Sequence, residues 1–383
     1  MSALWRAIKP ETMIAAMIVG FLTACTGAPA PSVETAAPVP MIAQETPAVT
    51  ESTPAGDATG SEPDNGKTAA SAYEMQKYPV PSGTHPHDVA PDPAGGIVWY
   101  TAQYQASLGL LDPGTGETRQ IFLGDGSRPH GVVVGPDGAP WIADGGLNAI
   151  VRVDPQTEEV QIFPLPASSP NANLNTATFD DKGILWFTGQ NGVYGRLDPQ
   201  DGEVEVFAAP RGRGPYGITT TPQGDVYYAS LAGSYIAQIN TETGEATVID
   251  PPTANQGARR VWSDSQGRIW VSEWNTGQLS VYDPATGAWD AWKLPGDSPH
   301  VYAVYVDDQD MVWVSEWGSQ AIARFDPQTE QFELFPLGAA QANVRQILGR
   351  AGEVWVPASG TDQIVVLRRQ DLAHALFMPG MHR

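Results

Sequence analysis

The chain has 383 residues, of which 42% are hydrophobic, and its formal charge at pH 7 is −22. This composition supports a sizeable core and excludes a wholly disordered chain, while the acidic excess without a run of Lys or Arg excludes a nucleic-acid partner. Its 40 Gly, 34 Pro and 12 Trp predict an all-β chain of short strands joined by tight turns.

The first 25 residues predict a lipoprotein signal peptide. Arg6 and Lys9 precede an apolar stretch, residues 13–24, that is too short to span a membrane comfortably. The stretch ends in Leu22-Thr23-Ala24-Cys25, which resembles the lipobox of bacterial lipoproteins, and Cys25 is the single cysteine of the chain. We therefore expect an exported protein held to the periplasmic or extracellular face of the cell envelope by lipidation of Cys25. A simple secretory peptide, or a short anchor with an incidental cysteine, is the alternative.

Residues 26–72 are rich in Ala, Pro, Thr, Ser and Glu and have almost no aromatic side chains. Such a segment buries too little apolar surface to offset its chain entropy, so we predict a disordered tether. The folded domain is expected over residues 73–370, and residues 371–383 are expected to form a tail.

A sevenfold repeat runs through the predicted domain. An aromatic residue recurs at intervals of 41 to 45 residues, at Trp99, Trp141, Trp186, Tyr227, Trp270, Trp313 and Trp355. In six of the repeats an Asp-Pro or Asn-Thr turn follows it, at Asp112, Asp154, Asp198, Asn240, Asp283 and Asp326. This period predicts a seven-bladed β-propeller of four-stranded blades. Helix-pair solenoids have similar periods, but so much Pro and Gly would break their helices.

The two ends of the repeat array predict how the ring closes. The seventh repeat has candidate strands at 344–348, 353–356 and 363–367 but no outermost strand. Residues 73–81 resemble the outer-strand segments 160–166 and 331–337. We therefore expect the N-terminal strand to complete the last blade, which removes an open sheet edge.

Loops from all seven blades should meet at one mouth of the central axis, a natural place for a ligand site. One set of positions lies about 11 residues before each repeated aromatic residue, and the other about three after it. The first set comprises His87 or Asp88, His130, Asn175, Tyr216, Arg259, Tyr302 and Val344, with His300 and Arg345 close by. The second comprises Ala102, Asp144, Gly189, Ser230, Glu273, Glu316 and Ala358.

Several segments place the chain near a known family. Arg128-Pro129-His130-Gly131, Gly135-Pro136-Asp137-Gly138 and Trp141-Ile142-Ala143-Asp144 together resemble the repeated PHGI, GPDG and WFTE unit of the streptogramin (virginiamycin B) lyases. Trp270-Val271-Ser272-Glu273-Trp274 and Trp313-Val314-Ser315-Glu316-Trp317 are similar to the WFTEW segments of that family. The resemblance covers all seven repeats.

The resemblance implies a carbon–oxygen lyase that opens a cyclic depsipeptide, or another lactone-like ester, by elimination. In this family a histidine removes a proton α to a carbonyl while carboxylate-bound Mg²⁺ steadies the developing charge. The family's two histidine positions are occupied here by Arg259 and Tyr302, and only Glu316 keeps the expected residue type. The site therefore has two possible locations. In the first, His300 takes part in a site formed by the late blades. In the second, the site lies in other blades, where His87, His130 and Asp144 reproduce the spacing of the family's residues.

The candidate site residues are assigned as follows. His130, His87, His300 and Tyr302 are candidate catalytic residues, and Arg259, Tyr216, Asn175 and Arg345 are candidate substrate-binding residues. Glu273, Glu316 and Asp144 are candidate ligands of Mg²⁺, with Ca²⁺ as the other oxygen-preferring ion.

Each of these assignments has a structural alternative. His130 would bond a loop carbonyl, His87 would be exposed to solvent, and the glutamates would pair with Arg259, Arg260 or Arg345. The repeated tryptophans are expected to pack the blades. We expect a monomer with a small-molecule or cyclic-peptide ligand. A non-enzymatic cell-surface binding propeller and a metal-dependent lactone hydrolase of the gluconolactonase type are the competing functions.

Overall fold

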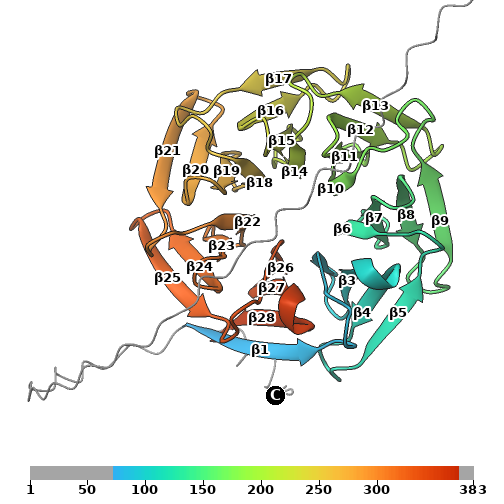
Figure 1. The fold of residues 1–383 in the computed structure, drawn as a ribbon, viewed down its shortest axis with the longest axis horizontal. Coiled ribbons are helices and arrows are strands. Elements are labelled where there is room, and N and C mark those ends of the chain that lie inside the picture. Colours follow the sequence, from blue (N-terminus) through green and yellow to red (C-terminus); the bar gives the residue numbers. More distant parts are fainter. Residues whose placement is uncertain (1–71, 371–383) are drawn as a thin grey trace, which may run out of the picture. The chain divides into compact units, whose positions relative to one another are not determined.

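The computed structural model describes residues 72–370, which form seven four-stranded antiparallel sheets around a central axis (Figure 1). The predicted all-β, seven-bladed propeller is therefore confirmed. The signal peptide with Cys25, nearly all of the tether and the tail lie outside the described residues. Within residues 72–370 no helix combines the length and the hydrophobicity needed to cross a membrane.

Each blade runs from an inner strand near the axis to an outer strand at the rim (Figure 1). The first four blades contain β2 (Val89–Pro91), β3 (Val98–Ala102), β4 (Ser107–Leu111) and β5 (Thr118–Phe122); β6 (Pro129–Val134), β7 (Pro140–Asp144), β8 (Ala149–Val153) and β9 (Val160–Pro164); β10 (Leu174–Phe179), β11 (Leu185–Gly189), β12 (Val193–Leu197) and β13 (Val204–Ala208); and β14 (Pro215–Thr220), β15 (Val226–Ser230), β16 (Tyr235–Ile239) and β17 (Ala246–Ile249).

The last three blades contain β18 (Ala258–Ser263), β19 (Ile269–Glu273), β20 (Gln278–Asp283) and β21 (Ala288–Lys293); β22 (Val301–Val306), β23 (Val312–Glu316), β24 (Ala321–Asp326) and β25 (Gln331–Pro336); and β26 (Leu348–Arg350), β27 (Glu353–Ala358) and β28 (Gln363–Arg369), with β1 (Tyr73–Pro79) as the outermost strand. Two short 3₁₀ helices, η1 (Gln103–Gln105) and η2 (Ser359–Thr361), connect the second and third strands of blades 1 and 7.

Strand β1 closes the ring, as the sequence predicts. It pairs antiparallel with β28 from Tyr73 opposite Arg369 to Pro79 opposite Gln363. The predicted inner strand at 344–348 is wrong in its bounds, because Val344 forms only an isolated bridge and regular pairing begins at Leu348. Between them, the Gln346 side-chain carbonyl accepts the Val89 N–H at 2.9 Å and so links blade 7 to blade 1.

The repeated aromatic residues pack the blades, which confirms that prediction. All seven are at most 4% exposed. Indole N–H groups also donate to an acid in the hairpin between the first two strands, as Trp186 does to Asp180 at 2.9 Å and Trp313 to Asp307 at 2.8 Å. The acid thus satisfies a buried indole donor and the turn amides together.

Buried hydroxyl groups tie neighbouring blades together close to the axis. The Ser272 hydroxyl accepts the Arg260 N–H at 2.9 Å and donates to the Tyr302 carbonyl of the next blade at 2.6 Å. Thr101 likewise accepts the Asp88 N–H at 3.0 Å and donates to the His130 carbonyl at 2.8 Å. These hydroxyl bridges fix the axial ends of the inner strands relative to one another.

Candidate functional site

Five inner strands carry a β-bulge at their axial ends. Pairing with the second strand shifts after Pro129, Leu174, Pro215, Ala258 and Val301. Each bulge contains a predicted site residue: His130, Asn175, Tyr216, Arg259 or Tyr302. Because a bulge adds an unpaired residue and re-aims its side chain, these groups can meet at the axis. With His87, Asp88 and Arg260 they form what we call the axial cluster.

The axial cluster contains a His–Asp dyad. His87 Nδ1 donates to Asp88 Oδ1 at 2.7 Å, which leaves Nε2 as the ring's proton acceptor. Arg260, from blade 5, crosses the axis and contacts both Asp88 oxygens at 3.2 and 3.3 Å. Its other terminal nitrogen donates to Thr176 Oγ1 in blade 3 at 2.5 Å. The dyad is therefore held rigidly by two other blades.

His130 lies directly beside the dyad, with 3.9 Å between its ring centroid and that of His87. Its Nδ1 donates to the Asn175 carbonyl at 3.0 Å, and the Asn175 side-chain amide donates to Nε2 at 3.3 Å. The alternative expectation that His130 bonds a loop carbonyl thus describes its main contact. Asn175 is fully buried, so it can orient His130 but offers no surface to a ligand.

Both histidines are held in the neutral form. Burial, followed by the charges of Arg345, Arg260 and Arg259, lowers the pKa of His87 well below 6.5. Burial and the neighbouring His87 likewise lower the pKa of His130 well below its ordinary value. The expected solvent exposure of His87 is wrong, because the ring is enclosed between Asp88 and His130 and only 7% of the residue is exposed. A neutral, oriented imidazole has the free lone pair that a general base needs, although its lowered pKa makes it a weaker base.

Two tyrosines and an arginine form the other half of the axial cluster. The hydroxyls of Tyr216 and Tyr302 lie 2.5 Å apart, and Arg259 donates to Tyr216 at 3.3 Å. Burial opposes ionisation of Tyr216, but Arg259 and Arg260 outweigh it, so the pKa of Tyr216 is lowered. Burial and the neighbouring Tyr216 raise the pKa of Tyr302. The pair therefore offers a hydroxyl donor beside a positive charge.

Arginine and aromatic side chains stack beside this pair in what we call the arginine–aromatic layer. Arg259 Cζ lies 3.5 Å from the Tyr302 ring centroid and 4.5 Å from that of Trp274. Tyr302 in turn stacks on Trp317 with centroids 5.2 Å apart, and Arg345 Cζ lies 5.3 Å from the Trp317 centroid. The layer joins blades 5, 6 and 7 at the mouth.

The three carboxylates predicted to bind a metal accept hydrogen bonds from their own hairpins and from neighbouring loops. Asp144 accepts the N–H groups of Arg128, Gly146 and Leu147, each at 2.9 Å. Glu316 accepts those of His300, Gly318 and Ser319 at 3.0, 2.6 and 2.5 Å.

Glu273 accepts the Thr276 hydroxyl at 2.5 Å, and burial raises its pKa. Among the described residues no ion pair joins Glu273 or Glu316 to Arg259, Arg260 or Arg345, so the predicted pairing is wrong. Arg260 pairs instead with Asp88, which lies closer to the axis.

Mg²⁺ and Ca²⁺ prefer oxygen ligands, and the residues of the mouth do not fit either ion. The one described group of at least three possible ligands within reach of a single ion is His87, Asp88 and His130, whose ligand atoms lie within 4.8 Å of one another. It has two nitrogens and a carboxylate already paired with Arg260. Three arginine charges near His87 also oppose a cation. The metal role of the three hairpin carboxylates stays a prediction.

A cleft of about 630 Å³ opens beside His130 between blades 1, 2 and 3, with Tyr104 and Arg128 also in its wall. Of the axial cluster, His130 alone lines this cleft. His300 contacts the arginine–aromatic layer, because its ring stacks on Trp274 with centroids 4.9 Å apart and its Nδ1 donates to the Trp274 carbonyl at 3.1 Å. The structure thus brings together the predicted catalytic and binding residues, with His300 and Arg345 joined through the arginine–aromatic layer.

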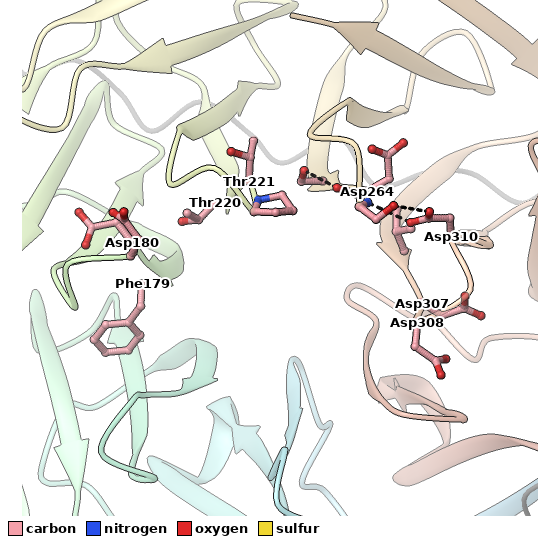
Figure 2. A pocket seen from close by; sticks show the side chains of 13 residues that line it. Phe179, Asp180, Thr220, Thr221, Asp264, Asp307, Asp308 and Asp310 are labelled. Atoms are coloured by element: carbon pink, nitrogen blue, oxygen red, sulfur yellow. Dashed lines mark hydrogen bonds between the residues drawn. The ribbon is translucent and has the colours of Figure 1, made fainter.

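A second cavity, of about 520 Å³, lies at the hairpins between the first and second strands of blades 3 to 6. Figure 2 shows its acidic lining, which includes Asp180, Asp264, Asp307, Asp308 and Asp310. The first three accept turn amides and tryptophan indoles, and Asp310 accepts the N–H of Ser265 at 2.9 Å. These acids therefore have structural partners.

Sequence reasoning missed part of the mouth. It treated Arg260 only as a partner for the glutamates, and it gave no role to Thr176, Trp274 or Trp317. A signal for the tryptophans exists, because a second Trp follows the hairpin glutamate in blades 5 and 6 only. A residue that departs from its own repeat in this way is not needed for the fold.

Comparisons with known proteins agree on family and fold. A sequence model of the virginiamycin B lyase family matches residues 59–286. The structure of virginiamycin B lyase from Staphylococcus aureus superposes with a TM-score of 0.72 at 20% identity, over 77% of this chain and 99% of that one. A catalytically inactive variant of that enzyme, solved with quinupristin, gives the same values.

One further structure and one further sequence match this chain. Hydrazine synthase of Kuenenia stuttgartiensis superposes with a TM-score of 0.63 at 13% identity, over 75% of this chain and 96% of that one. Gluconolactonase of Zymomonas mobilis is 29% identical over 145 residues, which are 33% of this chain and only 40% of that protein. At such low identities the structural likenesses establish the fold alone.

Proposed function

Because the chain belongs to the virginiamycin B lyase family, we propose that it is a carbon–oxygen lyase that opens a cyclic depsipeptide or lactone-like ester at the axial mouth. The observation that carries this proposal is the His87–Asp88 dyad, locked by Arg260 and set beside His130. Elimination requires a base that removes a C–H proton and a group that steadies the negative charge that develops.

In the proposed reaction His87 Nε2 takes the proton α to a carbonyl. The C–H electron pair forms a carbon–carbon double bond, and the adjacent C–O bond breaks with departure of a carboxylate. Asp88 stabilises the imidazolium that forms on His87, as an acidic partner does in other histidine-based sites. The Tyr216–Tyr302 pair supplies a hydrogen bond to the negative charge that develops.

The steps above are carried by this chain's own residues. Asp144 and Glu316 accept backbone N–H groups and Glu273 accepts a hydroxyl, and a metal role for these three carboxylates stays a prediction. With the steps above alone, addition of EDTA should leave turnover unchanged, whereas a loss of turnover would support the metal role.

The test is turnover by the full-length protein of a panel of cyclic depsipeptides and lactones, with quinupristin as the reference compound. Mass spectrometry separates the two chemistries, because elimination leaves the product mass unchanged while hydrolysis adds one water. His87→Asn should lower the rate by about 10²- to 10⁴-fold, the usual contribution of a general base. His85→Asn is the matched control, since His85 is an exposed neighbour whose positive φ suits asparagine.

Other results would select the competing functions. A product one water heavier would favour a lactone hydrolase, the activity named for the Zymomonas relative. Tight binding without turnover would favour a non-enzymatic binding propeller. An unchanged rate in His87→Asn would contradict the assignment of the base.

We also propose that the protein is exported and lipid-anchored through Cys25. The proposal rests on the lipobox-like Leu22-Thr23-Ala24-Cys25 segment. Metabolic labelling with a radioactive fatty acid should mark the wild-type protein in the envelope fraction and leave Cys25→Ser unlabelled. Labelling of the serine variant would refute the anchor.

A further inference from the structure

The axial mouth holds more positive charge than its acidic partners neutralise. Arg260 is paired with Asp88, but within residues 72–370 neither Arg259 nor Arg345 has a carboxylate within ion-pair distance. The nearby Glu273 and Glu316 bind their own hairpins, and no arginine charge lowers the raised pKa of Glu273. Two cationic side chains therefore remain uncompensated in a chain whose formal charge is −22.

Aromatic rings hold these two arginines without neutralising them. Arg259 lies over Tyr302 and beside Trp274, while Arg345 lies over Trp317 on the other side of the stacked pair. Cation–π contact fixes the plane of a guanidinium group and leaves its N–H edge available to an acceptor. The arginine–aromatic layer thus orients two planar donor groups at the mouth.

Arg259, like Arg260 and Arg324, has a buried donor without a hydrogen-bond partner among the described residues. Its Nε is buried and has no hydrogen-bond partner, although a terminal nitrogen donates to Tyr216. Leaving a buried donor unpaired costs about 1–3 kcal/mol, more when the group is charged. Because Arg259 lies at the mouth, an acceptor on a ligand could offset this cost, and a carboxylate satisfies the Nε and Nη edge of a guanidinium in a bidentate way.

We propose that Arg259 and Arg345 recognise a carboxylate on the ligand. This inference rests on the proposed function only for the substrate class. Taken together, the two proposals describe a substrate that is an anionic cyclic peptide or lactone with a free carboxylate. A carboxylate is favoured over inorganic phosphate because the donors are embedded in aromatic rings, which provide apolar surface for the organic part of a ligand. Arg260 is excluded from this role by its contact with Asp88.

The proposal is tested by calorimetric titration of the full-length protein with hippurate, which combines a carboxylate, an amide and an aromatic ring. Its uncharged amide, hippuramide, is the matched ligand control, and inorganic phosphate is the competing oxyanion. We expect hippurate to bind at least tenfold more tightly than either compound. Added NaCl should weaken the binding of hippurate.

Arg259→Gln and Arg345→Gln should each weaken hippurate binding at least tenfold and leave hippuramide binding unchanged. Arg119→Gln, an exposed arginine on β5 paired with Glu158, should bind as the wild type does. Arg259→Lys keeps the charge without the planar fork, so it should recover only part of the loss. A thermal melt of each variant checks that it is folded.

Equal binding of hippurate and hippuramide, stronger binding of phosphate, or no measurable hippurate binding would overturn the proposal. None of these results depends on catalysis. Elimination of quinupristin without hippurate binding would refute the carboxylate site and leave the proposed lyase intact. Hippurate binding without elimination of any compound of the panel would refute the lyase alone.

Discussion

The substitution Glu316→Gln distinguishes two roles of this carboxylate. One is a cap, which accepts hydrogen bonds from the hairpin and the loop before β22, and the other is a metal ligand. In the cap, Oε1 accepts the N–H groups of His300 and Gly318, and Oε2 accepts the N–H and the hydroxyl of Ser319. Burial opposes the charge, but these hydrogen bonds lower the pKa of Glu316 below its ordinary value. The ionised carboxylate is therefore the form that the hairpin stabilises.

The magnitude follows from which acceptor is lost. Glutamine keeps one carbonyl oxygen for His300 and Gly318, but its NH₂ group cannot accept from Ser319. A hydrogen bond to a charged group contributes about 1.5–3 kcal/mol, so we expect the variant to lose about 3 kcal/mol of unfolding free energy. Asp144→Asn is the comparison, because one oxygen of Asp144 takes all three amides and the loss should be smaller.

The assay is urea unfolding with and without MgCl₂. A ligand at a hundred times its Kd stabilises the folded state by about 2.7 kcal/mol, so a metal ligand would be readily detected. As a cap, Glu316 predicts no magnesium effect on the wild type or the variant. Stabilisation of the wild type by magnesium that disappears in Glu316→Gln would refute the capping role.

Two further predictions concern stability. The pKa values of His87 and His130 are lowered in the folded state, so the unfolded state takes up protons at a higher pH than the folded state does. The contribution of the two neutral histidines to the free energy of unfolding is therefore fully present above pH 6.5. It falls as the pH drops below 6.5, by up to about 1.4 kcal/mol per pH unit for each histidine. Urea unfolding at pH 7.5 and 5.5 should show this loss, and an equal loss in His87→Asn would contradict it. Thr101→Val removes a hydroxyl bridge and should cost about 2 kcal/mol of unfolding free energy, because it leaves the buried Asp88 N–H and His130 carbonyl without their partner. The exposed Thr247→Val on β17 should change the unfolding free energy by less than about 0.5 kcal/mol, and equal effects of the two substitutions would argue against the bridge.

The sequence alone determined the architecture, because the propeller signal is periodic and local. The spacing from Trp99 to Trp355 predicted seven blades, and the likeness of residues 73–81 to other outer strands predicted the closure between β1 and β28. Each blade buries its own aromatic residue, and most blades turn at their own acid, so one repeat predicts the next. The fixed offset from each repeated aromatic residue also predicted which residues lie near the axis.

Only the tertiary structure decided which of these residues act on one another. The contact between Arg260 and Asp88 joins residues 172 positions apart, and nothing local distinguishes Arg260 from Arg259. The alternation of a strand would also place neighbouring residues on opposite sides, but the bulge after Ala258 allows both arginines to reach the axis. Which charged side chains pair across the propeller axis depends on this three-dimensional geometry, and the repeat pattern of the sequence does not reveal it.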